Sequence, residues 1–272
     1  MTLPVAIIDV WDIETFDAEL RSSLDVHADL IRDYMLTNRR QWLEREASDH
    51  TGAHPENSFA STFMRVEEYI VTPLMKARTI RAWHYTRMTD REVDIIRRDG
   101  IYPSSIAKFR ARLDAEVVAG SFSAEIADRL FTDSPYQSGQ RASRSGKFWA
   151  VSNPHSIDDS GVELLVESWG GEAAYFWQRD KGLQELLKQI GHARVLEVAV
   201  PLSYSRHAFY AARAVVATYG RMLGCVPDNG GFDLYTSQPL PAQNVIAVHS
   251  DGDPSFATMA RGYPASFIKP DD

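Results

Sequence analysis

The sequence predicts an α+β fold, with helices in the first half of the chain and strands alternating with helices in the second. Apolar residues recur at helical spacing over residues 13–47, whereas residues 79–86 and 195–201 are short runs typical of strands. The chain has 272 residues, 44% of them hydrophobic and 24% charged, which is ordinary for a globular protein. We expect a mostly helical region over residues 1–78 and a second domain over residues 79–272.

The first half of the chain gives a clear order of elements. We expect a strand at residues 4–10, one long helix or two over residues 13–47 and a loop at residues 48–60. A helix at residues 61–75 and a strand at residues 79–86 follow.

Helix-capping residues mark the next three helices. Thr89 and Glu92 have the spacing of a capping box, and Gly100 is a suitable stop. A second helix is expected to start at Ser104 or Ser105, and a third at Ser123. Residues 132–146 then form a long polar loop, which we interpret as a candidate lid or target-recognition loop.

The remainder alternates between the two element types. Strands are expected at residues 147–152, 195–201, 232–235 and 245–249, and helices at 160–169, 181–190 and 207–219.

Composition restricts the cellular context. The net charge of −8 disfavours non-specific binding to nucleic acid by the whole surface, although a local basic patch is compatible with it. The single Cys225 allows no internal disulfide, and no apolar run approaches the ~20 residues of a membrane span. The first residues do not form a signal-peptide pattern. We therefore expect a cytoplasmic protein with no membrane partner.

Common catalytic and metal motifs are missing. The sequence has no G-x-G-x-x-G, no phosphate-binding G-x-x-x-x-G-K-[ST] and no G-x-S-x-G. His50 and His54 are four residues apart, but Gly52 and Pro55 indicate a loop, so we expect no metal. The basic residues between Arg91 and Arg112 are interpreted as a solvated helix face, with a patch that faces nucleic acid as the alternative.

Three separated pieces concentrate hydrogen-bonding and aromatic groups. The first, His84-Tyr85-Thr86-Arg87, ends a predicted strand and is more polar than a core strand requires. The second joins Lys147-Phe148-Trp149-Ala150 to Gly170-Gly171-Glu172-Ala173-Ala174-Tyr175. The third is Asp233 at the start of a late strand, followed by the segment 241–248.

In this order the pieces resemble the ADP-ribosyltransferase superfamily, on its diphtheria-toxin-like side. There a strand histidine with a nearby hydroxyl is followed by a helix and a glycine turn, here Gly100-Ile101. A late strand carries an acid before a P-x-x-x-I-x-x-V segment, here Pro241 to Val248. The resemblance covers residues 79–250 and implies a split, mixed β-sheet core.

The resemblance implies that NAD is the substrate and that no metal is needed. His84 and Thr86 would hold ribose hydroxyls, and Asp233 would stabilise the oxocarbenium-like ribose. Tyr175 would stack on nicotinamide with Trp149 or Tyr85.

Arg87 or Arg81 would pair with the pyrophosphate. In a regular strand Tyr85 points away from His84 and Thr86, so His84 and Thr86 are the stronger candidates.

The sequence departs from the superfamily at the acid. Asp233 stands where active members usually carry Glu, so Glu172 or Glu167 is an alternative source of the carboxylate. Gly231 excludes the E-x-E motif of arginine-specific enzymes, which argues against arginine as acceptor.

The resemblance implies an NAD-dependent mono-ADP-ribosyltransferase, acting as an intracellular toxin or antiphage effector on nucleic acid or protein and held by an antitoxin. Alternatives on the same fold are an NAD glycohydrolase or an RNA 2′-phosphotransferase. A different class is a non-enzymatic binding or immunity protein, in which residues 13–47 would dock a partner and His84 would be buried structure.

Overall fold

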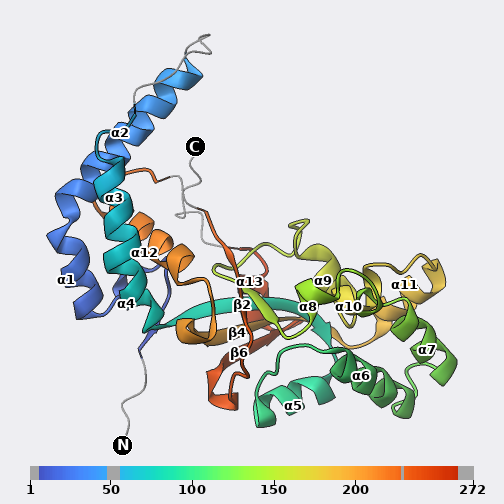
Figure 1. Ribbon diagram of the computed structural model, residues 1–272. Helices are drawn as coiled ribbons and strands as arrows, with labels where there is room; N and C mark the ends of the chain where they lie inside the picture. Colours follow the sequence, from blue (N-terminus) through green and yellow to red (C-terminus); the bar gives the residue numbers. More distant parts are fainter. Residues whose placement is uncertain (1–5, 48–55, 228–229, 263–272) are drawn as a thin grey trace, which may run out of the picture. The chain divides into compact units, whose positions relative to one another are not determined.

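The computed structural model describes residues 6–47, 56–227 and 230–262, and confirms that helices are combined with a β-sheet (Figure 1). The strands are β1 (Ile7–Ile8), β2 (Thr79–Met88), β3 (Phe148–Val151), β4 (His192–Pro201), β5 (Asp233–Thr236) and β6 (Val245–Ser250). They form one six-stranded sheet in the order β5-β3-β2-β4-β6, with β1 paired to β2. The β1–β2 pair is parallel, while β2–β3, β3–β5 and β4–β6 are antiparallel, so the sheet is mixed.

The chain divides into two compact units, which differ from the two expected regions. Among the described residues, unit 1 runs to Arg81 and resumes at Pro201–Phe232, while unit 2 is Ala82–Val200 and resumes at Asp233. The first boundary lies three residues beyond the expected residue 78. In this division the described residues 201–227 and 230–232, which the sequence analysis placed in the second domain, lie in unit 1.

Unit 1 is helical. Its elements are η1 (Ile13–Thr15), α1 (Ala18–Val26), α2 (Ala28–Glu46), α3 (Ala60–Val66), the π-helical η2 (Glu67–Val71), α4 (Thr72–Lys76), η4 (Leu202–Tyr204) and α12 (Ala208–Met222). The expected helical region 13–47 is two α-helices preceded by a short 3-10 turn. Asp17 caps α1 by accepting a hydrogen bond from Leu20 N, and its ion pair with Arg78 lowers the Asp17 pKa.

Helix α12 lies at the centre of unit 1, which explains why its residues are grouped with the N-terminal helices. Most of its residues are buried, as expected for a helix with apolar residues on all sides. Thr218 Oγ1 donates to Val10 O at 2.7 Å, and Tyr219 Oη donates to Asp25 at 2.6 Å. A Cβ atom on Gly220 would lie 2.2 Å from Met35 Sδ, so the helix approaches α2 very closely there.

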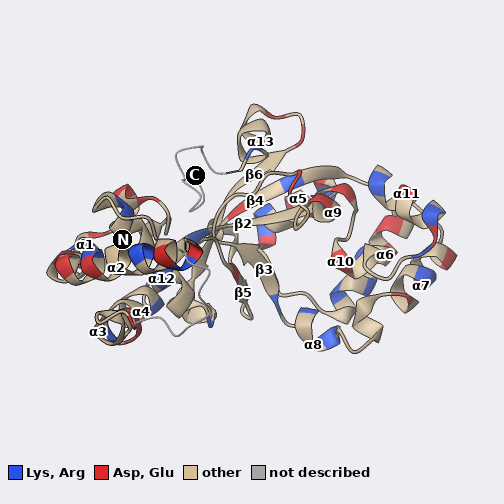
Figure 2. Ribbon diagram, turned by 90° about the horizontal axis from the view of Figure 1, so that it is seen from above, with Lys and Arg blue, Asp and Glu red and all other residues tan. Residues whose placement is uncertain are grey.

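Unit 2 contains the remaining helices. They are α5 (Asp90–Asp99), α6 (Ile106–Val118), α7 (Ala124–Thr132), η3 (Pro135–Gln137), α8 (Arg141–Arg144), α9 (Glu163–Glu167), α10 (Glu172–Tyr175), α11 (Lys181–Gln189), η5 (Ala242–Asn244) and α13 (Pro254–Met259). Seen from above, α6, α7, α10 and α11 gather at one end of the strands (Figure 2).

The local capping predictions for unit 2 are confirmed. Thr89 and Glu92 form the capping box of α5, and Ser105 and Ser123 cap α6 and α7. Gly100 ends α5 with φ 84°, in the region that favours glycine. The polar loop 132–146 contains two short helical turns, η3 and α8.

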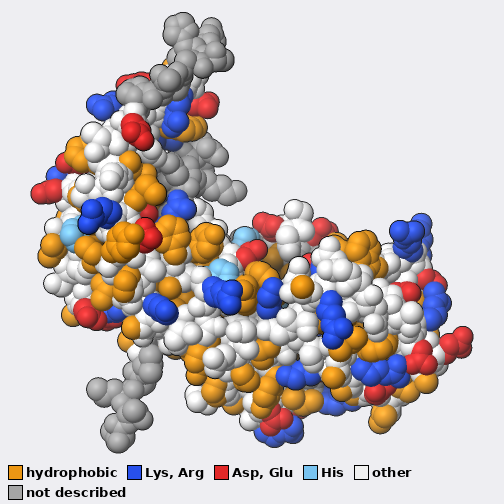
Figure 3. Space-filling view, in the orientation of Figure 1, with side chains coloured by type: hydrophobic (Ala, Val, Ile, Leu, Met, Phe, Trp, Pro, Cys, Tyr) orange, Lys and Arg blue, Asp and Glu red, His pale blue; other side chains and the backbone are white. Residues whose placement is uncertain are grey.

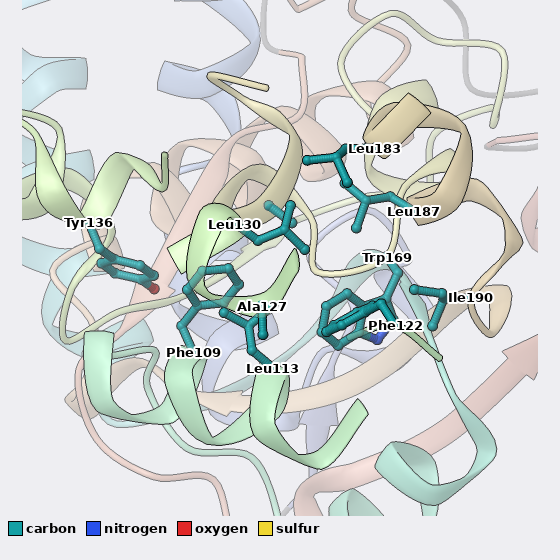
Figure 4. Packing of buried hydrophobic residues seen from close by; sticks show 11 residues of the cluster. Phe109, Leu113, Phe122, Ala127, Leu130, Tyr136, Trp169, Leu183, Leu187 and Ile190 are labelled. Atoms are coloured by element: carbon teal, nitrogen blue, oxygen red, sulfur yellow. The ribbon is translucent and has the colours of Figure 1, made fainter. Parts of the chain in front are cut away.

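Two hydrophobic clusters stabilise unit 2. The larger joins α6, α7 and α11 around the fully buried Trp169, and Figure 4 shows Phe122 packed against its indole. The smaller contains Trp83 and Tyr85 of β2, Val162 and Val166 near α9, and Phe256 of α13. Outside the clusters, charged side chains of both signs are spread over each unit (Figure 3). None of the helices in the described ranges combines the length and hydropathy of a membrane span.

Candidate active site

The strands that carry the first and third sequence pieces lie on either side of the strand that carries Trp149. Strand β3 pairs with β2 through Val151 and Trp83, and with β5 through Val151 and Asp233. Because residues paired across strands share a face, Trp83, Val151 and Asp233 lie on one face of the sheet. His84 follows Trp83 and therefore lies on the opposite face. We call the two sides the His84 face and the Tyr85 face.

Ring contacts agree with this assignment. The His84 ring lies 4.7 Å from the ring of Phe148. Phe148 directly precedes Trp149 on β3, so the two side chains point to opposite faces of the sheet. On the other side, Trp149 contacts Tyr235, with 4.8 Å between ring centroids. In Figure 1, α5 lies below the strands and α9 lies above their end, so helices lie on both sides of the sheet.

His84 is a neutral histidine held in one orientation. Its Nδ1 lies 2.8 Å from Trp149 O, and because a carbonyl oxygen can only accept, Nδ1 carries the proton. Burial lowers the His84 pKa to about 4, with a further contribution from the positive charge of Arg112. The ring therefore keeps its other nitrogen, Nε2, unprotonated at neutral pH, where it can accept a hydrogen bond.

Arg112 on α6, whose positive charge acts on His84, is held in place by Glu92. Its Nε donates to Glu92 Oε1 at 2.7 Å, and its guanidinium lies 5.0 Å from the Trp169 ring centre. Glu92 also accepts from Thr89 N at 2.8 Å and from Trp169 Nε1 at 2.9 Å. Burial alone would raise the pKa of the Glu92 carboxyl. Arg112 and the two N–H donors lower this pKa by more, so the net pKa is below its usual value.

A second arginine approaches from α8. The Arg144 guanidinium pairs with Glu172 at 2.8 Å and lies 4.5 Å from the Phe176 ring centre. Its Nε is buried and has no hydrogen-bond partner among the described residues. Burial raises the pKa of Tyr136, while a hydrogen bond from Ser104 and the positive charges of Arg112 and Arg144 lower it.

Glu172 and Tyr175 are presented by one turn of helix after two glycines. Gly170 and Gly171 have φ of 83° and 58°, and a Cβ atom on Gly170 would lie 2.8 Å from Ala174 Cβ. Burial raises the Tyr175 pKa to about 12, aided by the negative charge of Glu172, so the phenol is neutral. Glu172 is thus joined to Arg144 by an ion pair, and the charges of Arg144 and Arg112 both act on the pKa of Tyr136.

The Tyr85 side chain is buried, and its hydroxyl is hydrogen-bonded to the backbone. Its hydroxyl donates to His155 O at 2.8 Å and accepts from His155 N at 2.6 Å. Burial raises its pKa to about 12. With both hydrogen-bonding functions of the hydroxyl used, Tyr85 has a structural environment, as the alternation argument indicates.

The remaining candidates on β2, β3 and β5 also face away from His84. Arg87 Nε donates to Ile190 O at 2.9 Å, and burial lowers the Arg87 pKa. Trp149 is 39% exposed, and Asp233 is exposed at the first position of β5. His84 and Thr86 therefore share a face, while Tyr85, Arg87, Trp149 and Asp233 lie on the opposite one.

Sequence reasoning did not place Arg112, Arg144 or Tyr136 in the site, and it gave Glu92 only a helix-capping role. Arg112 was grouped with solvated helix residues, because helical periodicity does not show that Glu92 of the preceding helix reaches it. Arg144 lies in the polar loop 132–146, and the basic residues of that loop were the only sequence feature that could have pointed to a role for Arg144. Within the described ranges, no group of three or more His, Cys, Asp or Glu side chains has the arrangement of a metal site.

No family model, curated protein or solved structure matches this chain. The site is therefore interpreted from its own residues.

Proposed function

We propose that this protein cleaves the bond between nicotinamide and ribose in NAD and transfers ADP-ribose to a macromolecule. One observation carries the proposal: the neutral, oriented His84 lies on the central strand of the sheet, where the positive charge of Arg112 acts on it. In the proposal, His84 forms a polar cluster with Arg112, Tyr136 and the Arg144–Glu172 pair. Such a cluster can bind hydroxyls, phosphates and a developing cation at the same time.

The chemistry needs little acid catalysis. The nicotinamide nitrogen of NAD is positively charged, so the glycosidic electron pair leaves with it and nicotinamide departs neutral. The positive charge then lies on the ribose, as in glycoside hydrolysis, where a nearby carboxylate stabilises it. The acceptor oxygen or nitrogen forms the new bond to C1′ and releases its proton to solvent or to the carboxylate.

We assign the carboxylate to Glu172 in place of Asp233. The β2–β3–β5 register supports this choice, because Asp233 lies on the face opposite His84. Glu172 is ion-paired at 2.8 Å with Arg144, whose positive charge, like that of Arg112, lowers the pKa of Tyr136.

The other side chains have complementary roles in this proposal. His84 Nε2 and the Thr86 hydroxyl hold ribose hydroxyls, and the neutral Tyr175 ring stacks on nicotinamide. Arg112 and Arg144 bind the diphosphate, and the unpartnered Arg144 Nε supplies a donor for it.

The cellular role we propose is that of a toxin or defence effector acting inside the cell and controlled by an antitoxin. Expression of the wild-type chain should then arrest growth, and His84→Ala should restore it. Harmless expression of an active wild-type enzyme would contradict the toxin role without affecting the proposed reaction.

The reaction is tested with two labels on NAD. With the label in nicotinamide, the purified chain should release free nicotinamide. With the label in the adenylate, a fraction of cell lysate should become labelled, and nuclease or protease treatment identifies the class of acceptor. Nicotinamide release with no labelled macromolecule would identify an NAD glycohydrolase. No release at all would overturn NAD cleavage and favour a binding protein.

A further inference from the structure

A surface of aromatic and basic side chains borders the Glu172–Arg144 pair. Three of its aromatic side chains are exposed, namely Trp149 at 39%, Phe176 at 41% and Trp177 at 45%. The members are Trp149, Tyr235, Phe176, Trp177, Lys147 and Arg144, and we call them the aromatic–cation surface. None of the reactions proposed above requires large aromatic side chains in contact with water.

Contacts join these residues into one continuous surface. Lys147 Nζ lies 4.9 Å from the Tyr235 ring centre and 5.6 Å from that of Trp149. Trp149 Nε1 donates to Ser143 O of α8 at 3.2 Å. From the next residue of α8, the Arg144 guanidinium lies over Phe176, whose ring contacts Trp177 at 4.9 Å.

The segment that carries Arg144, Lys147 and Trp149 is basic, and Glu172 at the border of the surface pairs with Arg144. Residues 134–157 contain Arg141, Arg144 and Lys147 and no Asp or Glu, although the chain carries a net charge of −8. Blue ribbon marks Lys and Arg positions at α8 in Figure 2, at the strand ends where this segment lies. The surface therefore attracts an anionic partner while most of the protein repels one.

The combination of exposed rings and cations favours one kind of anion. An acidic peptide would use the cations but would leave the rings in water. Bases in a duplex are stacked on each other and cannot reach the rings. Single-stranded nucleic acid offers phosphates for the cations and an open base face for each aromatic ring.

We propose that the aromatic–cation surface binds single-stranded nucleic acid. Binding of the strand is inferred from the surface itself, whereas its role as the acceptor of ADP-ribose rests on the proposed function. The ion pair from Arg144 to Glu172 then connects the bound strand directly to the carboxylate of the site.

Binding is tested on the full chain in the absence of NAD, using fluorescence anisotropy of fluorescein-labelled (dT)15 and (rU)15. We expect saturable binding to at least one of them that weakens with salt, and weaker binding to a duplex of the same length. Lys147→Gln should reduce the slope of log K against log salt by about 0.7, the value for one phosphate contact on a single strand. Trp177→Ala and Phe176→Ala should each weaken binding by about five-fold or more.

Matched controls are exposed residues elsewhere in the chain. Tyr69→Ala removes an aromatic ring that is 67% exposed on η2, and Lys181→Gln removes an exposed lysine on α11. Both should bind as wild type does, and circular dichroism verifies that every variant is folded.

Three results would overturn the inference: no binding to either oligonucleotide, equal binding to the duplex, or folded surface variants that bind as tightly as the controls. Tighter binding to a polyglutamate peptide than to both oligonucleotides would assign the surface to an acidic protein instead. Because the assay contains no NAD, its failure is distinguishable from a failure to release nicotinamide.

Discussion

The two faces of the sheet at β2 use similar residue types in different ways. On the Tyr85 face, the hydroxyl of Tyr85 is satisfied by the His155 backbone, and Trp83 and Tyr85 belong to a hydrophobic cluster. On the His84 face, the histidine keeps an unprotonated nitrogen near Arg112. A polar side chain at a strand end therefore indicates chemistry only when its hydrogen-bonding capacity is not already used by the fold.

The largest expected effect is on the His84 face. We expect His84→Ala to lower nicotinamide release by about 10²-fold or more, because a misplaced ribose loses the alignment needed for cleavage. The free energy of unfolding should fall by no more than about 1.5 kcal/mol, the usual value of one hydrogen bond. Kinetics and urea denaturation on the same preparation check both values. Unchanged release would show that His84 is structural.

The opposite pattern is expected for Tyr85. Tyr85→Phe leaves the partly buried His155 N–H and C=O without their partner, which should cost about 1–3 kcal/mol of unfolding free energy. Nicotinamide release by the folded protein should stay within about two-fold of wild type. Tyr102→Phe, at an exposed tyrosine, is the matched control for stability. A large loss of activity with unchanged stability would place Tyr85 in the site and contradict the division between the faces.

A smaller effect concerns pH. The His84 pKa is about 4 in the folded protein, below the ordinary histidine value of 6.5. Between these values the unfolded chain binds the proton and the folded chain does not, so stability is lost as pH falls from 6.5 towards 4. This contribution is at most about 1.4 kcal/mol per pH unit.

Comparison with His84→Asn isolates this contribution, because the amide can still donate to Trp149 O but does not titrate. Below pH 6.5 the stability difference between the two proteins should shift in favour of the variant. Parallel stability curves from pH 7 to 4.5 would show that the pKa of His84 is not depressed. The comparison is needed because Glu67, whose pKa burial raises to about 7, changes stability in the opposite direction.

Local signals in the sequence predicted much of the fold. The helix starts at Thr89, Ser105 and Ser123 follow from side chains that bond to backbone groups a few residues away, and no distant contact is needed to predict them. The grouping of α12 with the N-terminal helices could not be predicted in this way, because it depends on the close approach of Gly220 to Met35.

The candidate site was less predictable for the same reason. The face of Asp233 is set by the register between β3 and β5, and a shift by one residue would reverse it. No local pattern around Asp233 determines that register. Similarly, the contact between Arg112 and Glu92 joins two helices at positions that each fit a solvated face.

Nicotinamide release by the matched variants Glu172→Gln and Asp233→Asn tests the central claim most directly. Both substitutions remove a negative charge and keep the shape of the side chain. We predict that Glu172→Gln lowers the rate by about 10²-fold or more, as expected for loss of a group that stabilises transition-state charge. Asp233→Asn should stay within about three-fold of wild type. The reverse result, with activity lost at Asp233 and retained at Glu172, would contradict the assignment of the active site to the His84 face.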